Sequence, residues 1–287
     1  MTVFFMINLN GTLYSEQTAK LSIKNRGLLY GDAVFETIKG VNGQLFFWED
    51  HYFRLMASMR ILRMEIPMHF SMEFLEDEIK KTIRAADFEK QSLRIKLYVN
   101  RKEGGKYNPT NHGVYYFIEL EATGDPFYTF NEDRYEVELF KDHYIYANLL
   151  ATLKSNAKII NVLGSIYATE NGYQNCLLLN DKKMVVEALQ GNLFLVKGTT
   201  IITPPTSDGC LRGIIRKQLI EICKTLQEYT LEEKSISSFD LQKADELFIT
   251  NVMIGIQPIS NYRKKVYKNE VARMLLQKLN VKVRLAS

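Results

Sequence analysis

Alternating apolar and polar positions near the amino terminus predict strands joined by tight turns. Phe4 to Asn8 is apolar and rich in strand formers, and Asn10-Gly11 supplies the pair of residues with positive φ that a hairpin turn requires. Asn42-Gly43 does the same between residues 35–38 and residues 45–48. We therefore expect two β-hairpins in this part of the chain.

Helical spacing replaces the alternation after Glu49-Asp50, an acidic pair suited to a first helical turn. The apolar stripe predicted for this helix comprises Phe53, Met56, Ala57, Met59, Arg60 and Leu62. A second helix is predicted over 74–86. Strands follow at 93–99 and 114–120, on either side of a loop that runs from Arg101 to Gly113. The first part of the chain is thus predicted to be α+β.

A linker is predicted at Ala122 to Pro126, where turn formers interrupt every periodicity. We expect a smaller N-terminal domain over 1–121, a linker over 122–130 and a larger C-terminal domain over 131–287. The second part is predicted to contain helices at 155–171, 214–226 and 270–279, with strands at 176–179, 184–187, 193–196, 201–203 and 246–250.

The composition is that of an ordinary globular protein, with 46% hydrophobic and 24% charged residues and a net charge of +4. It excludes disordered and fibrous classes. The apolar runs are strand-sized and no basic stripe suits a phosphate backbone, so we expect neither a membrane span nor a nucleic-acid partner. An amino terminus without a signal-peptide pattern predicts a cytoplasmic location. Cys176, Cys210 and Cys223 are odd in number and scattered, so no disulfide is expected.

The motifs of several large enzyme classes are missing. The sequence contains no Walker loop, no G-x-G-x-x-G, no H-E-x-x-H, no G-x-S-x-G and no Cys/His spacing typical of a metal site. We therefore expect no metal. The histidines lie in unrelated contexts and are interpreted as surface or packing residues: His51, His69, His112 and His143.

Six segments, in this order, resemble the fold-type IV family of pyridoxal-phosphate (PLP) enzymes, the class IV aminotransferases and their lyase relatives. The segments are Arg26 to Thr37, His51 to Leu55, Leu153 to Asn156, Val186 to Phe194, Leu211 to Arg216 and Ala244 to Thr250. The resemblance implies an α+β fold of two domains, a smaller N-terminal α/β sandwich and a larger β-barrel-like C-terminal domain with helices. It also implies PLP as cofactor, a small-molecule amino substrate, and a homodimer with active sites near its interface.

Three residues match the main cofactor contacts of this family. Lys154 matches the lysine that forms the internal Schiff base with PLP and then acts as general base at the substrate Cα. Glu187 matches the carboxylate that keeps the pyridinium nitrogen protonated, although by spacing alone it is equally an ordinary strand-end glutamate. Arg54 matches the arginine that binds the phosphate, for which its planar fork is suited, and the alternative is an exposed arginine on a helix.

Further cofactor contacts are implied in the second half of the chain. Ile214 and Ile215 begin a helix after a glycine, so their N–H groups and the helix dipole would attract the phosphate. Leu211 matches the apolar residue that packs on the ring, or else it belongs to the core. Asn251 and Val252 occupy a loop of the family on the phosphate side.

The chain departs from many relatives around the expected phosphate site. Those relatives carry Gly and then Ser or Thr after the glutamate, where this chain has Ala188-Leu189-Gln190, and they carry Thr where Ile215 and Val252 stand. The missing hydroxyls weaken the expected phosphate site but leave its backbone donors. A binding protein that kept the fold and lost catalysis is therefore an alternative.

Two segments bear on the reaction. Asn251 to Pro258 looks more like the 4-amino-4-deoxychorismate lyases than like transaminases of branched-chain or D-amino acids, which usually carry small hydroxyl residues and a glutamate there. Arg101 to Tyr107 resembles the lyase pattern of Arg, a Gly pair, a basic residue and Tyr. We therefore expect the lyase reaction, which releases pyruvate and 4-aminobenzoate. The alternative is a transaminase with a 2-oxo acid acceptor.

Two residues are candidates for substrate contacts. Lys106 matches the basic residue that the neighbouring subunit contributes to hold a substrate carboxylate, and the alternative is a solvated lysine in a loop. Phe35 would line the substrate side, or else belong to the core.

Overall fold

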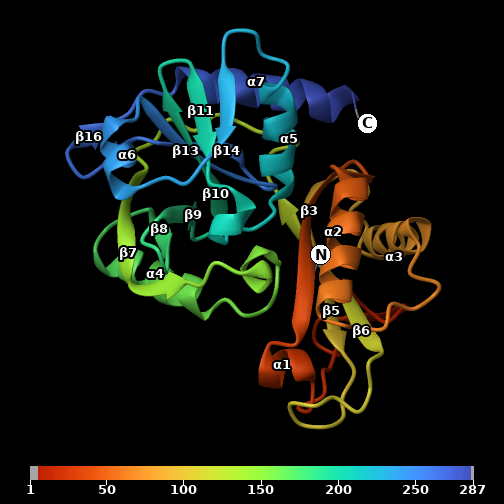
Figure 1. Ribbon diagram of the computed structural model, residues 1–287. Coiled ribbons are helices and arrows are strands. Elements are labelled where there is room, and N and C mark those ends of the chain that lie inside the picture. Colours follow the sequence, from red (N-terminus) through yellow and green to blue (C-terminus); the bar gives the residue numbers. More distant parts are fainter. Residues whose placement is uncertain (1–5, 286–287) are drawn as a thin grey trace. The chain divides into compact units, whose positions relative to one another are not determined.

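The computed structural model describes residues 6–285 and divides the chain into two compact units (Figure 1). The first unit contains the residues up to Pro126 together with Lys154–Ala157, and the second contains Phe127–Leu153 and Lys158–Leu285. The segment Lys154–Ala157 thus belongs to the first unit although it lies far beyond Pro126 in the sequence.

An antiparallel sheet of six strands, in the spatial order β2-β1-β6-β5-β3-β4, forms the first unit. The strands are β1 (Met6–Leu9), β2 (Thr12–Ser15), β3 (Ala33–Val41), β4 (Gln44–Leu45), β5 (Ser92–Arg101) and β6 (Val114–Thr123). Both predicted hairpin turns are confirmed, because Asn10-Gly11 and Asn42-Gly43 have positive φ. Phe4 and Phe5 of the predicted first strand lie outside the described residues.

Helices α2 (Trp48–Ile61) and α3 (Met72–Ala85) cover one face of this sheet, and the short α1 (Arg26–Tyr30) precedes β3 (Figure 1). Because strand side chains alternate, every second residue points at the two helices. The resulting core includes Ile38, Leu55, Met59, Leu75, Ile79, Ile95, Leu97, Val99 and Ile118. The opposite face carries Phe35, Tyr98 and Phe117, which are aligned across β3, β5 and β6.

The second unit is built on a branched, mixed sheet of ten strands. The strands are β7 (Glu136–Ile145), β8 (Asn175–Asn180), β9 (Val185–Ala188), β10 (Gly191–Lys197), β11 (Thr200–Thr203), β12 (Thr230–Glu233), β13 (Glu246–Asn251), β14 (Gly255–Ile259), β15 (Asn261–Tyr262) and β16 (Lys265–Val266). Their order is β12-β11-β10-β9-β8-β7-β15-β16, and the sheet branches where β13 pairs with both β10 and β14.

The helices of the second unit are α4 (Ile159–Glu170), α5 (Ile214–Cys223), α6 (Ser238–Lys243) and α7 (Glu270–Leu285), with 3-10 turns at Leu149–Thr152 and Thr206–Asp208. Within the described residues, no helix has both the length and the apolarity needed to cross a membrane. Cys176, Cys210 and Cys223 are buried free thiols, and burial raises the pKa of each.

Three predicted elements differ from the structure. The helix expected over 155–171 begins only at Ile159, because the preceding residues pair with β3. The strand expected over 45–48 ends at Leu45, since Phe47 adopts a left-handed conformation and Trp48 begins α2. Three members of the predicted stripe on α2 are exposed, namely Phe53, Ala57 and Arg60. The buried face of α2 instead includes the polar residues His51 and Ser58, which an apolar pattern does not mark.

One buried carboxylate fixes the start of the C-terminal helix. Glu246 begins β13, and its two carboxylate oxygens accept hydrogen bonds from the N–H groups of Val271 and Ala272 at 2.9 and 3.0 Å. These donors belong to the first turn of α7, where N–H groups have no partner inside the helix.

We predict that Glu246→Ala lowers the free energy of unfolding by about 2–4 kcal/mol, because it leaves two buried donors unsatisfied. Denaturant unfolding measures this loss. Glu270→Ala is the matched control, since Glu270 is an exposed carboxylate in the same helical turn and its loss is expected to cost under about 1 kcal/mol. Equal losses in the two variants would contradict the capping role.

Candidate active site

The outer edge of β3 holds Lys154 in place through its backbone. The Phe35 N–H donates to the Lys154 carbonyl at 2.9 Å, the Asn156 N–H donates to the Ala33 carbonyl at 3.1 Å, and Ser155 forms a bridge with Val34. This backbone pairing also places the Lys154 side chain beside β3. Its Nζ lies 4.8 Å from the centre of the Phe35 ring. The structure therefore brings two of the predicted site residues together.

The sheet face around Phe35 carries a second ammonium group. Lys96 Nζ lies 5.7 Å from the ring centre of Phe35 and 5.8 Å from those of Tyr98 and Phe117. Lysine over aromatic rings is favourable by cation–π attraction. We name Phe35, Lys96, Tyr98 and Phe117 the Phe35 face. Sequence analysis missed Lys96, because only the register of β3, β5 and β6 places it beside Phe35.

The opposite side of β3 presents Glu36, whose buried carboxylate binds two residues of α2. Arg54 Nε donates to Glu36 Oε1 at 2.8 Å, Arg54 Nη2 donates to Oε2, and His51 Nδ1 lies 2.6 Å from Oε2. Burial raises the pKa of Glu36, but the charge of Arg54 and the hydrogen bonds from His51 and Arg54 outweigh it and lower the pKa from 4.5 to about 2. Arg54 is thus oriented by an ionised carboxylate.

His51 is fully buried and is a neutral partner of this pair. Burial is the main cause that lowers its pKa, and the nearby charges of Arg54 and Lys154 act in the same direction. The short contact with Glu36 is therefore a hydrogen bond from neutral imidazole to carboxylate rather than an ion pair. Because Nδ1 carries the proton, Nε2 has a free lone pair, and it is buried without a hydrogen-bond partner among the described residues.

In the second unit, Glu187 belongs to a buried polar assembly at the end of β9. Its Oε2 accepts the Leu211 N–H at 2.9 Å and lies 3.5 Å from Asn192 Nδ2, which also donates to the Leu211 carbonyl at 2.8 Å. A Cβ on Gly213 would lie 1.9 Å from Asn192 Oδ1, so a side chain there would require the Asn192 side chain to move. The structure thus brings Glu187 and Leu211 into direct contact, and Asn192 contacts both.

The start of α5 lies directly beyond this assembly. Gly213 is the N-cap residue and makes no side-chain cap, while Ile214 and Ile215 are buried. The apolar side chain of Ile215 is therefore accounted for by packing. The N–H groups of the first turn point out of the helix end, where they can meet an anion.

Asn251 ends β13 and Val252 follows it, next to the same assembly, because Thr250 pairs with Asn192 in the sheet. The Asn251 side chain accepts from the N–H groups of Met253 and Ile254 and donates to the Gln190 carbonyl. The Asn251 side chain thus shapes the turn to β14. A ligand at this turn would meet the backbone rather than this side chain. The Val252 carbonyl accepts from the Tyr128 hydroxyl at 2.9 Å.

Lys106 lies elsewhere in the first unit, on the loop between β5 and β6. Its side chain is exposed and its carbonyl accepts from Arg26 Nη1 at 2.6 Å. The described residues contain no cluster of His, Cys, Asp or Glu that could hold a metal ion.

The ionisation of Glu36 yields a prediction on stability. Its pKa is lower in the folded protein, so its contribution is complete above about pH 4.5 and is lost as the pH falls towards 2. The difference between 4.5 and about 2 corresponds to about 3 kcal/mol. We expect Glu36→Gln to be less stable than the parent protein at pH 6, with a difference that shrinks by about this amount at the acid end.

Denaturant unfolding from pH 6 down to the lowest pH at which the protein folds measures this effect. Exposed Glu49→Gln serves as the control and is expected to follow the parent curve. A pH-independent difference between Glu36→Gln and the parent would contradict the ionised pair.

Comparison with known proteins covers nearly the whole chain. A protein of Methanocaldococcus jannaschii, provisionally named a branched-chain-amino-acid aminotransferase, is 31% identical over 96% of this chain and 94% of its own length. An aminodeoxychorismate lyase of Vibrio harveyi is 26% identical over 82% of this chain and 85% of its own length. Among solved structures, the branched-chain aminotransferase of Thermoproteus uzoniensis superposes with a TM-score of 0.85 at 26% identity, over 96% of this chain and 93% of that one.

The family model of class IV amino-transferases matches residues 33–262, which include all the residues of the two assemblies around Glu36 and Glu187. The mixed helix and sheet architecture agrees with the solved aminotransferase structure, as the sequence predicted. The chain therefore belongs to the class IV aminotransferases, a family of PLP-dependent enzymes with the fold-type IV architecture.

Proposed function

We propose that this protein is an aminotransferase that moves the amino group of a branched-chain amino acid to a 2-oxo acid. The observation that carries the proposal is the position of the Lys154 amine over the Phe35 ring, on a face that combines aromatic rings with the Lys96 ammonium. Aromatic rings suit an apolar side chain, and an ammonium group suits a carboxylate. The higher identity and coverage of the M. jannaschii relative support this reaction over the lyase reaction that the sequence alone led us to expect.

The residues present fit PLP. Lys154 would hold the cofactor covalently, Glu187 would pair with its ring nitrogen, and Leu211 would pack on the ring. Arg54, the first N–H groups of α5 at Ile214 and Ile215, and the backbone of Asn251 and Val252 would bind its phosphate. Thr250 Oγ1 is a buried hydroxyl without a hydrogen-bond partner among the described residues, and it lies on the same strand face as Asn192. This hydroxyl would add one donor to the phosphate site, although relatives carry their threonines at other positions.

When bound, PLP supplies an electron sink for the pair of electrons left at the substrate Cα. Lys154 would take the proton from the substrate Cα as general base and return a proton to C4′ of the cofactor. Glu187, held by the Leu211 N–H, would keep the ring nitrogen protonated. Glu36, which binds Nε and Nη2 of Arg54, would orient this guanidinium group, whose charge would attract the phosphate. The Phe35 face would exclude water from the substrate side chain.

We predict that the purified protein with added PLP absorbs near the visible edge and transaminates L-leucine, L-isoleucine or L-valine with 2-oxoglutarate. Lys154→Ala should lose the band after dialysis and reduce turnover by more than about 100-fold, because the base is removed. Exposed Lys182→Ala is the matched control and should keep both.

The outcomes separate the candidate reactions. Faster turnover of D-alanine than of any L-amino acid would replace the proposed substrate class. Release of pyruvate and 4-aminobenzoate from aminodeoxychorismate would establish the lyase, which the Gly104-Gly105-Lys106 loop favours. A protein that shows no absorbance band with added PLP would overturn the proposed enzymatic function altogether.

We also propose a homodimer, supported by an apolar stripe on α4. Ile159, Val162, Leu163 and Ile166 recur at helical spacing and are 37–66% exposed, while Gly164 and Ala168 face the unit's own core. Contiguous exposed apolar side chains on one helix are typical of an interface. In such a dimer, Lys106 of one copy would reach a carboxylate of the substrate bound to the other copy.

We predict that Val162→Glu converts the protein from dimer to monomer at micromolar concentration, because it places a charge in this stripe. Light scattering measures the mass. Gln227→Glu adds the same charge at an exposed site in another part of the unit and should leave the dimer intact. A monomeric parent protein would overturn the proposal.

A further inference from the structure

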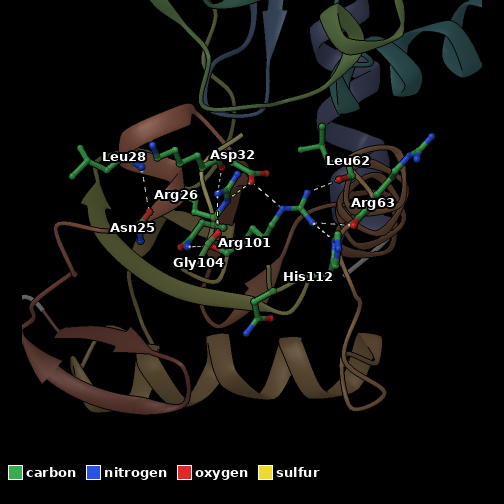
Figure 2. Close-up of polar contacts among 12 residues, drawn as sticks. Asn25, Arg26, Leu28, Asp32, Leu62, Arg63, Arg101, Gly104 and His112 are labelled. Atoms are coloured by element: carbon green, nitrogen blue, oxygen red, sulfur yellow. Dashed lines mark hydrogen bonds and ion pairs between the residues drawn. The ribbon is translucent and has the colours of Figure 1, made fainter. Parts of the chain in front are cut away.

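One carboxylate in the first unit holds two buried arginines. Asp32 Oδ2 accepts from Arg26 Nε and from Arg101 Nε, each at 2.9 Å, and both arginine side chains are at most 6% exposed (Figure 2). We name these three residues the Asp32 clamp. Two buried guanidinium groups at one site require a shared anion, since unpaired buried charges cost several kcal/mol.

Each arginine of the clamp reaches a different segment. Arg26 Nη1 donates to the carbonyls of Gly104 and Lys106 at 3.1 and 2.6 Å, and thus holds the loop between β5 and β6 (Figure 2). Arg101 donates to the carbonyls of Leu62 and Arg63 at 2.6 and 2.9 Å, just beyond the end of α2. The clamp therefore connects the loop that carries Lys106 to the helix that carries Arg54.

The loop needs such an external hold because of its glycines. Gly104 and Gly105 have φ of +123° and +70°, and a Cβ would lie 2.4 Å from Thr110 Oγ1 and 2.1 Å from the Asn108 carbonyl oxygen, respectively. Only glycine fits these positions, but a glycine pair loses much conformational freedom when it is ordered. The two hydrogen bonds from Arg26 stabilise this fold of the loop on either side of Gly105.

We propose that the Asp32 clamp is a positioning device for Lys106, which fixes the loop backbone so that the Lys106 ammonium meets a carboxylate of the substrate at a defined place. The inference rests on the proposed function and on the proposed dimer, in which Lys106 of one copy binds a carboxylate of the substrate held by the other copy. A lysine side chain has many rotamers, so a fixed backbone removes part of the entropy cost of binding. Asp32 and Arg26 act only through Lys106 and the loop.

The test uses the PLP-loaded enzyme and Arg26→Lys, which keeps a charge for Asp32 but cannot bridge Asp32 and two carbonyls. We expect KM for the amino acid and for the 2-oxo acid to rise about tenfold, with kcat within about twofold and an unchanged PLP absorbance band. Lys106→Gln should raise KM similarly, and the double variant should be no worse than Lys106→Gln alone. Arg94→Lys, in an exposed pair with Glu121, is the control and should match the parent.

A second measurement needs no activity. Hydrogen exchange of the amides over residues 103–111 should be faster in Arg26→Lys than in the parent and unchanged in Arg94→Lys. Unchanged exchange overturns the clamp, whatever the enzyme does. Additive effects of Arg26→Lys and Lys106→Gln in an active enzyme overturn the positioning role and leave the proposed function standing. Absence of turnover in the parent with any donor overturns the proposed function instead, together with the role assigned to Lys106.

Discussion

The requirement that a buried charge be paired governs the first unit. Glu36 lies in the middle of β3 on the side that faces α2, where an isolated carboxylate would cost several kcal/mol. Arg54 and His51 both turn towards it, and this explains why α2 buries His51 while Phe53 is exposed. The same pairing fixes the fork of an arginine that could not otherwise be held in one orientation on a helix surface.

Strand β3 combines this pairing with two further tasks. Its outer edge pairs with Lys154–Asn156, and its other face presents Phe35 to the Lys154 ammonium. A backbone edge cannot move independently of the side chains on the same strand, so Lys154, Phe35 and Glu36 keep a fixed relation. Preorganisation of this kind is what a reacting amine requires, because displacements of about 1 Å cost much of the rate.

The sequence allowed local features to be predicted and long-range ones only by resemblance. The turns at Asn10-Gly11 and Asn42-Gly43 follow from residue chemistry alone. The helix expected from Ser155 was wrong at its start, because the backbone of Lys154 to Asn156 pairs with β3 and the helix begins only at Ile159. Lys96 could not be found, since its neighbours on the Phe35 face come from three strands and depend on register.

Buried polar contacts show the same limit. No spacing in the sequence indicates that the Leu211 N–H donates to Glu187, or that the Asn192 side chain contacts both residues and lies against Gly213. These contacts make the Glu187 carboxylate part of the fold rather than an added group, because removing it would leave the Leu211 N–H without its acceptor.

This arrangement also bears on the departures from the family. A threonine at Ile215 or Val252 would bring a hydroxyl into a buried place that the present side chains fill with apolar contacts. Without those hydroxyls, the phosphate contacts that we propose in the second unit would be the N–H groups at the start of α5 and the Thr250 hydroxyl. Backbone donors are fixed by the helix itself and lose no side-chain entropy on binding, so they are the part of a phosphate site that tolerates such substitutions best.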